Sequence, residues 1–153
     1  MRSDQQWVGE YSESHRNATN KLIHKICVPA IVWTVAALLW CIPVPAGWPV
    51  GTWSLLSAAL ALVFYFRLSL NMGLGMLCYF AVAFGLCYWL ARWIGLKGLG
   101  GSAAVVFVVA WIAQFIGHDI EGKRPSFMKD LAFLLVGPMW LLADLYRRSG
   151  IKY

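Results

Sequence analysis

Apolar residues dominate the middle of the chain, where they form four long runs separated by short polar or proline-containing segments. The runs cover residues 26–42, 53–66, 73–94 and 102–117. Several are shorter than the roughly 20 apolar residues of a typical membrane span, which implies tilted helices or a locally thinned bilayer. The pattern predicts about four transmembrane helices, arranged as two helical hairpins.

A fifth apolar run, residues 131–143, is too short for an ordinary span and contains Gly137 and Pro138. Proline removes a backbone donor and disturbs a helix that contains it. We therefore expect a short re-entrant or interfacial helix near the C-terminus. Together these elements predict an all-α, polytopic membrane bundle that forms a single integral membrane domain over residues 1–153.

Charged residues are almost absent from the central block. It has no acidic residue between Ile26 and His118, and its only charges are those of Arg67, Arg92 and Lys97. The whole chain is 60% hydrophobic and 13% charged, which leaves too little polar surface to cover a water-soluble globule. All seven acidic residues and all three histidines lie at the two ends of this block.

Basic residues gather before the first run and after the fourth, which predicts that both termini face the cytoplasm. Tryptophans gather at the two intervening turns, as interfacial anchors do. The net charge of +6 is then explained by orientation and by anionic lipids, without nucleic acid. The small size and the lack of a targeting extension favour a bacterial inner membrane, with the endoplasmic reticulum as the alternative. The basic residues are Arg2, Arg16, Lys21, Lys25, Lys123, Arg124, Lys129, Arg147, Arg148 and Lys152.

Two histidines precede the first apolar run, each with a polar residue four positions earlier. Tyr11 and His15 form one such pair, and Asn20 and His24 form the other. Residues four apart share one face of a helix, but nine residues turn a helix through about 900°, which leaves His15 and His24 on opposite sides. A break near residues 17–20 is needed if both bind one ligand, and Asn20 is the predicted N-cap of the helix that enters the membrane.

The third histidine belongs to a polar stripe at the end of the fourth run, formed by Trp111, Gln114, His118 and Glu121. If the helix continues that far, these residues share a face, and such groups at membrane depth should point into the bundle. An even number of crossings returns His118 to the other histidines. Three neutral imidazoles suit a divalent metal such as Fe(II) or Zn(II), although any single histidine could be simply hydrogen-bonded or interfacial. Glu121 could be a ligand, a partner that orients His118, or the N-terminal charge of the next helix.

Two motifs resemble those of the membrane family of Fe(II)-dependent 2-hydroxy fatty acid dioxygenases, whose known eukaryotic members act in phytosphingosine breakdown. The resemblance covers nearly the whole chain, including the Gly-Pro pair of the C-terminal run. The first motif contains Tyr11, His15, Asn17, Asn20, Ile23, His24 and Pro29. The second contains Trp111, Gln114, Phe115, Gly117, His118, Glu121 and Pro125.

This resemblance implies α-oxidation, in which a 2-hydroxy fatty acid and O2 give the acid shorter by one carbon, with CO2 and water. No external reductant is needed, so no 2-oxoglutarate, flavin or nicotinamide site is expected. Fe(II) held by His15, His24 and His118 would bind the substrate's carboxylate and 2-hydroxyl and activate O2. The remaining catalytic residues would be Glu121, Tyr11, Asn20 and Gln114. Arg16, Lys21, Lys123 or Arg124 could meet the carboxylate, although each could instead be only a topology signal.

Two other classes compete with this interpretation. Another metal-dependent membrane lipid oxidase, such as a di-iron desaturase, would need more histidines than the three present here. A non-enzymatic transporter or assembly factor would place polar residues along a central pathway, whereas here they gather at one face, as in an interfacial enzyme. The sequence leaves the oligomeric state open.

Overall fold

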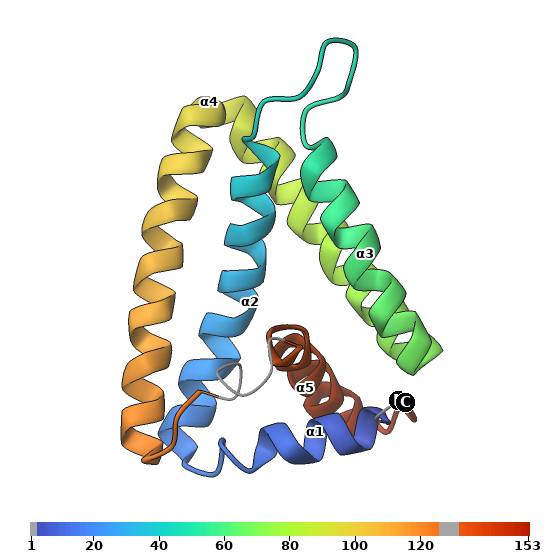
Figure 1. The fold of residues 1–153 in the computed structure, drawn as a ribbon, viewed down its shortest axis with the longest axis vertical. Helices are drawn as coiled ribbons and strands as arrows, with labels where there is room; N and C mark the ends of the chain where they lie inside the picture. The colour runs from blue at the N-terminus through green and yellow to red at the C-terminus, as the bar shows by residue number, and fades with distance from the viewer. Residues whose placement is uncertain (1–2, 126–131) are drawn as a thin grey trace.

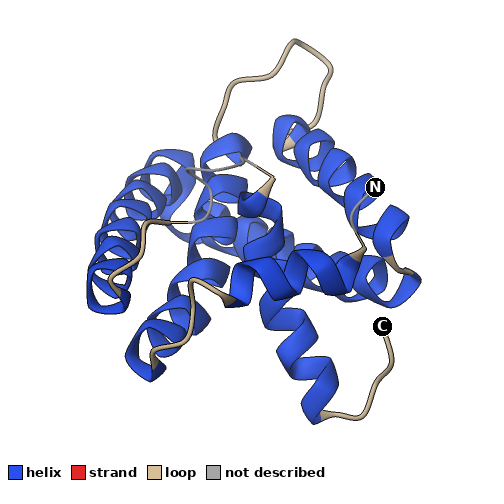
Figure 2. Cartoon of the chain, turned by 60° about the horizontal axis from the view of Figure 1, so that its bottom comes forward, coloured by secondary structure: helices blue, strands red, loops and turns tan. Residues whose placement is uncertain are grey.

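The computed structural model describes residues 3–125 and 132–153, and its regular structure there is entirely helical (Figure 2). This confirms the all-α prediction. Three residues used in the sequence predictions, Arg2, Lys129 and Leu131, lie outside the described residues. In chain order the helices are α1 (Asp4–Ser12), α2 (Ala18–Trp40), α3 (Thr52–Leu68), α4 (Leu70–Glu121) and α5 (Phe133–Arg148).

Helix α4 is a hairpin of two helical arms. Gly95 interrupts it with φ 71° and ψ 169°, a conformation that only glycine adopts without strain. Residues 70–94 and 96–121 therefore run in opposite directions on either side of this turn (Figure 1). The arms correspond to the third and fourth predicted runs. By length and composition, α2 and α4 are able to cross a membrane, while α3 is apolar but shorter.

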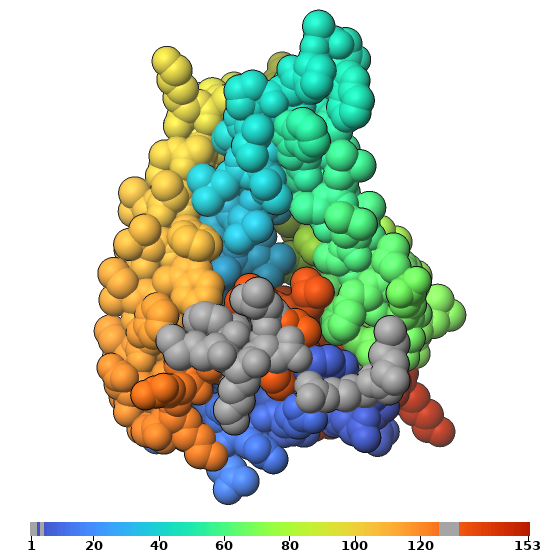
Figure 3. Space-filling model, in the orientation of Figure 1, coloured from blue at the N-terminus to red at the C-terminus, as the bar shows by residue number. Residues whose placement is uncertain are grey.

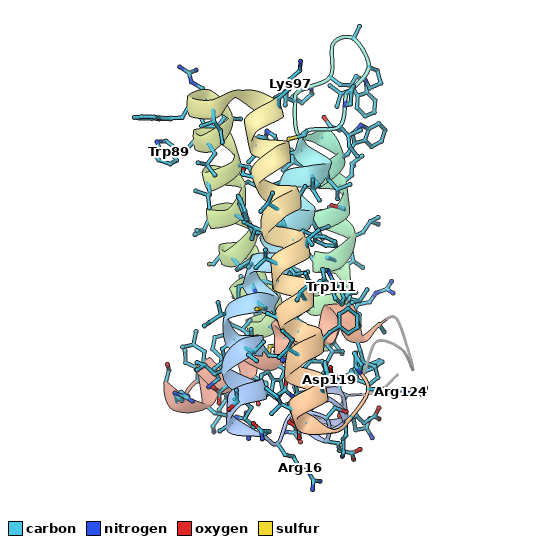
Figure 4. The ribbon with its side chains drawn as sticks, turned by 90° about the vertical axis from the view of Figure 1, so that its left-hand side faces the viewer. Arg16, Trp89, Lys97, Trp111, Asp119 and Arg124 are labelled. Atoms are coloured by element: carbon cyan, nitrogen blue, oxygen red, sulfur yellow. The ribbon has the colours of Figure 1, made fainter. Side chains whose placement is uncertain are left out.

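The polar ends of α2 and α4 lie at the same end of the bundle. Figure 4 places Arg16, Asp119 and Arg124 at this end, and Trp89 and Lys97 at the opposite end. The loop between α2 and α3 also lies at the far end, beside the turn of α4 (Figure 1). The out-and-back path of α4 thus returns the chain to the level at which α2 begins.

The start of α2 differs from the prediction. Asn17 caps this helix, because its side-chain Oδ1 accepts hydrogen bonds from the backbone N of Thr19 at 2.8 Å and of Asn20 at 3.4 Å. The prediction that Asn20 is the N-cap is wrong, since Asn20 lies in the first turn with its side chain fully buried. The expected break between His15 and His24 is confirmed, because α1 ends at Ser12 and α2 starts at Ala18.

Helix α5 lies across the lower end of α2 and packs against α1 (Figures 1 and 4). Trp7 of α1 meets Phe133 edge-on at a centroid distance of 5.2 Å. The indole of Trp140 donates a hydrogen bond to the hydroxyl of Ser12 at 2.9 Å. An ion pair of 3.1 Å between Lys25 and Asp144 ties α5 to α2. Through these contacts α1 and α5 pack together at the end of the bundle where α2 begins.

Small residues allow α2 and the second arm of α4 to pack closely. Ala103, Ala110 and Gly117 are buried at seven-residue intervals on that arm. Such residues let two helix backbones approach in a membrane protein. The buried face of α2 carries Asn20 and His24, four residues apart. Both therefore face the arm that carries His118.

Candidate metal centre

The three histidines meet in a buried cluster. His15 lies between α1 and α2, His24 lies in α2, and His118 lies near the end of α4. Their exposed fractions are 1%, 0% and 5% respectively. The ring centroids are separated by 4.3 Å for His15 and His24, 5.1 Å for His15 and His118, and 4.9 Å for His24 and His118. Residues separated by up to 103 positions in the chain, 118 − 15, thus share one site.

Backbone hydrogen bonds orient two of the rings. Nδ1 of His15 lies 2.7 Å from the carbonyl oxygen of Tyr11, and Nδ1 of His24 lies 3.0 Å from that of Asn20. A carbonyl only accepts, so each Nδ1 carries the proton and each Nε2 keeps its lone pair. Nε2 of both residues and Nδ1 of His118 are buried without a hydrogen-bond partner.

These nitrogen atoms fit a divalent metal ion. The candidate ligand atoms of the three histidines all lie within 4.8 Å of one another. Two imidazole nitrogens bound tetrahedrally to one ion at about 2.1 Å lie about 3.4 Å apart, so the three rings must move closer together when a metal binds. An ion would also satisfy buried nitrogen atoms that otherwise cost desolvation free energy.

The electrostatics of His15 favour the neutral form that metals bind. Burial lowers its pKa to about 4, and the cation of Lys21 acts in the same direction. The backbone hydrogen bond to Tyr11 and the charge of Glu121 oppose this shift without reversing it. The ring is therefore unprotonated at neutral pH and able to coordinate.

Glu121 connects the end of α4 to the loop that carries His15. Its two carboxylate oxygens accept hydrogen bonds from the backbone N of Arg16 at 2.9 Å and of Asn17 at 2.8 Å. They also accept one from the side-chain amide of Asn20 at 3.0 Å. The potential metal-binding group found among the described residues contains the three histidines without Glu121.

Asn20 fills the space between α2, α4 and the same loop. Its amide donates to the carbonyl of Ser14 at 3.2 Å as well as to Glu121. These two acceptors fix the orientation of the amide. Its Oδ1 points at α4, where a Cβ added to Gly117 would lie only 2.6 Å away. A side chain at position 117 therefore has no room while Asn20 keeps its place.

We expect Gly117→Ala to destabilise the fold by about 1–3 kcal/mol, because the added methyl must push Asn20 away from Glu121. Thermal unfolding in detergent measures this effect. Gly101→Ala on the same arm is the control, since a Cβ there meets no atom within 4 Å and alanine favours the helix. Equal unfolding temperatures for the two variants would contradict the expected clash.

Tyr11 and Gln114 lie beside the histidine cluster and line one cavity with His118. Tyr11 stacks on His15 with a centroid distance of 4.0 Å and an interplanar angle of 11°. Burial raises the pKa of Tyr11 above its usual value, so its hydroxyl stays a hydrogen-bond donor. Tyr11, Gln114 and His118 are polar residues on the wall of a cavity of about 50 Å³, which is otherwise mainly apolar. This volume holds a few water-sized molecules.

The four candidate substrate-binding cations divide between two surface hollows. Arg16 and Lys21 line one of about 290 Å³, which reaches His15. Lys123 and Arg124 line another of about 420 Å³, which reaches His118. The Lys123 ammonium also donates to the backbone carbonyl of Glu13 at 2.8 Å. The structure thus places two cations on each side of the histidine cluster.

One contributor to the site was not found from the sequence. Trp140 of α5 lies against His15, with ring centroids 5.5 Å apart, and also contacts Tyr11 at 5.6 Å. It lies two residues after Pro138 in a run that was interpreted only in terms of membrane insertion. The sequence around Trp140 has no polar or metal-binding pattern, so it does not indicate this role.

Comparison with known proteins identifies one family for the chain. Residues 1–149 match the family model described as "Mpo1-like: 2-hydroxy-palmitic acid dioxygenase Mpo1-like". No curated protein and no solved structure matches the chain. The matched range contains every residue discussed at the histidine cluster.

Proposed function

Because the chain belongs to the Mpo1-like family, we propose that it is an Fe(II)-dependent dioxygenase that shortens 2-hydroxy fatty acids by one carbon. The observation that carries the proposal is the buried set of three histidines with unpaired ring nitrogens within 4.8 Å of one another. In the balanced reaction, R–CH(OH)–COOH and O2 give R–COOH, CO2 and H2O. The four electrons that C1 and C2 lose in this cleavage are accepted by O2 alone.

The choice of iron rests on chemistry as well as on the family. Imidazole ligands suit zinc, copper, iron and nickel, but zinc has no redox chemistry to offer a dioxygenase. Bound Fe(II) would supply the activation of O2 and the polarisation of the substrate's carboxylate and 2-hydroxyl. His15, His24 and His118 would hold it, and the carbonyls of Tyr11 and Asn20 orient the rings of His15 and His24.

The neighbouring residues have separate roles in this proposal. Tyr11 and Gln114 donate hydrogen bonds into the small cavity beside His118, where the reacting head group and O2 would lie. Asn20 and Glu121 hold the three ligand-bearing segments together and act as positioning residues. The apolar remainder of the cavity wall keeps bulk water from the reacting atoms.

The cationic side chains near His118 would bind the carboxylate of the substrate. The hollow lined by Lys123 and Arg124 and the small cavity both reach His118, so a head group there touches cation and metal site together. Arg16 and Lys21, on the His15 side, supply positive potential that attracts a fatty acid anion to this end of the bundle.

We further propose a multi-pass membrane protein with four crossings, made by α2, α3 and the two arms of α4. Exposed tryptophans at the far end, such as Trp48 at 50% and Trp93 at 73%, suit one membrane interface. The basic residues around the histidine cluster suit the cytoplasmic interface, which places both termini in the cytoplasm. A bacterial inner membrane is the proposed location, with the endoplasmic reticulum as the alternative.

Turnover of a defined substrate tests the proposed function. Purified protein in lipid nanodiscs, loaded anaerobically with Fe(II), is expected to convert 2-hydroxypalmitate and O2 to pentadecanoate and CO2 in equal amounts. Palmitate, which lacks the 2-hydroxyl, should give no product under the same conditions. Protein that binds one equivalent of iron but yields no pentadecanoate would contradict the proposal and favour a non-enzymatic membrane role.

A further inference from the structure

A second and larger cavity opens next to the histidine cluster. It is an apolar groove of about 390 Å³ between α2, α3, α5 and the second arm of α4, and we call it the acyl groove. Figure 3 shows the molecule hollowed between α2 and α3, above α5. A volume of this size is typical of sites for small organic ligands.

The acyl groove adjoins the cavity beside His118. The residues that line both are Ile31, Val32, Trp111 and Leu134. Movement of these shared side chains would open a path from the polar group of Tyr11, Gln114 and His118 into the groove. Trp111 stands at the junction, one helical turn before Gln114.

The length of the path follows from the helices that form it. Val35 lies 11 residues after His24 on α2, and Phe107 lies 11 residues before His118 on α4. At 1.5 Å per residue, both helices place the far end of the groove about 17 Å from the cluster. The two helices thus give the same depth for the groove. This depth suits a ligand with a long hydrocarbon chain.

The groove offers apolar contacts to a ligand. Its two serine hydroxyls already donate to backbone carbonyls, Ser54 to Ala36 at 2.8 Å and Ser57 to Ser54 at 2.9 Å. The other residues identified on its wall are aliphatic or aromatic. Cavities of this character stay dry and bind hydrocarbon.

From this adjacency, depth and apolar character we propose that the acyl groove holds the hydrocarbon chain of the 2-hydroxy fatty acid, with Val35 limiting its length. The inference rests on the proposed function for the identity of the head group. A membrane phospholipid is a poorer occupant, because the junction beside Trp111 opens into a cavity of only about 50 Å³. One chain with a small head group fits there, whereas a glycerol backbone with two chains does not.

Val35→Trp tests the length limit. Val35 is 42% exposed, so a larger side chain can enter the groove without displacing buried neighbours. The value of kcat/KM for 2-hydroxypalmitate is expected to fall about tenfold, as for the loss of two buried methylene groups, while that for 2-hydroxyoctanoate stays unchanged. Val109→Trp, at a 60% exposed position outside the groove, is the control and should affect neither substrate. Equal effects of Val35→Trp on both chain lengths would overturn the length limit.

A binding measurement without iron tests the groove independently of turnover. A 2-hydroxypalmitate probe with a diazirine at its methyl end is irradiated with iron-free protein in nanodiscs, and labelled residues are mapped by mass spectrometry. Labels at Val35, Ser57 or Phe107 that unlabelled 2-hydroxypalmitate displaces would support the proposal. Labels confined to outward positions such as Val109, or labels that only phospholipid displaces, would overturn it. Displaceable groove labelling without any iron-dependent turnover would instead show that the proposed reaction is wrong while the groove remains a fatty acid site.

Discussion

Replacing His24 by alanine is expected to abolish stoichiometric iron binding and the turnover of 2-hydroxypalmitate. His24 is fully buried, its Nε2 has no hydrogen-bond partner, and its ring touches both other histidines. Removal of one of three ligands should cost more than the roughly 10–100-fold loss caused by changes to outer partners of a metal site. Iron content after anaerobic reconstitution and pentadecanoate formation measure the two effects.

Two further variants separate loss of a ligand from loss of the fold. His24→Gln preserves most of the side-chain volume, so it should unfold close to the wild-type temperature while still failing to retain iron. Tyr88→Ala removes an aromatic ring that is 59% exposed on α4, and it should keep both iron and activity. His118→Ala should behave as His24→Ala does, although the two residues lie on different helices. Full iron occupancy in either histidine variant would remove the basis for the metal centre.

Much of this site could be predicted from local patterns. The four-residue spacing of Tyr11 and His15, and of Asn20 and His24, reflects helix geometry, and in both pairs the backbone of the first residue binds the ring of the second. The predicted polar stripe requires the helix to continue beyond the apolar run as far as Glu121, and α4 does end at Glu121. The four helical segments, an even number, then bring His118 back to the end of the bundle at which α2 begins.

The remaining features depend on contacts between distant segments. Asn17 and Asn20 are both good caps, but the Asn20 side chain is occupied by its contacts with Glu121 and Ser14, and Asn17 caps the helix. The sequence left three roles open for Glu121, and it could not indicate the hydrogen bond from the backbone N of Arg16, which lies 105 positions away in the chain. The place of Trp140 beside His15 depends on how α5 crosses the bundle, for which no periodic pattern gives a signal.

Charge patterns carried less information about the site than about orientation. The positive-inside rule concerns the side of a membrane on which a residue lies, and it says nothing of which hollow the residue lines. The cations near the histidines accordingly separate into Arg16 and Lys21 on one side and Lys123 and Arg124 on the other. Lys25, interpreted as one more topology signal, instead pairs with Asp144 and anchors α5.

Replacing Glu121 by glutamine is expected to weaken iron binding by roughly 10–100-fold without removing a ligand. The carboxylate receives three hydrogen bonds, from Arg16, Asn17 and Asn20, and the NH2 group of glutamine would face donors in place of an acceptor. Loss of these contacts frees the His15 loop from α4 and should lower the free energy of unfolding by about 2 kcal/mol. Competition with a metal chelator gives the affinity, and chemical denaturation gives the stability.

Cobalt substitution shows whether Glu121 positions the ligands or is itself a ligand. If it acts through the His15 loop, the Co(II)-loaded Glu121→Gln protein should show the wild-type visible spectrum once enough metal is added, since the coordinating atoms are unchanged. A ligand role would alter the spectrum at saturation. Glu10→Gln, the same substitution at an exposed position of α1, is the control and should leave metal affinity and spectrum at wild-type values. Wild-type iron affinity in Glu121→Gln would show that the hydrogen bonds between Glu121 and the His15 loop have no part in holding the metal. The three histidines would then be positioned by the segments that carry them alone.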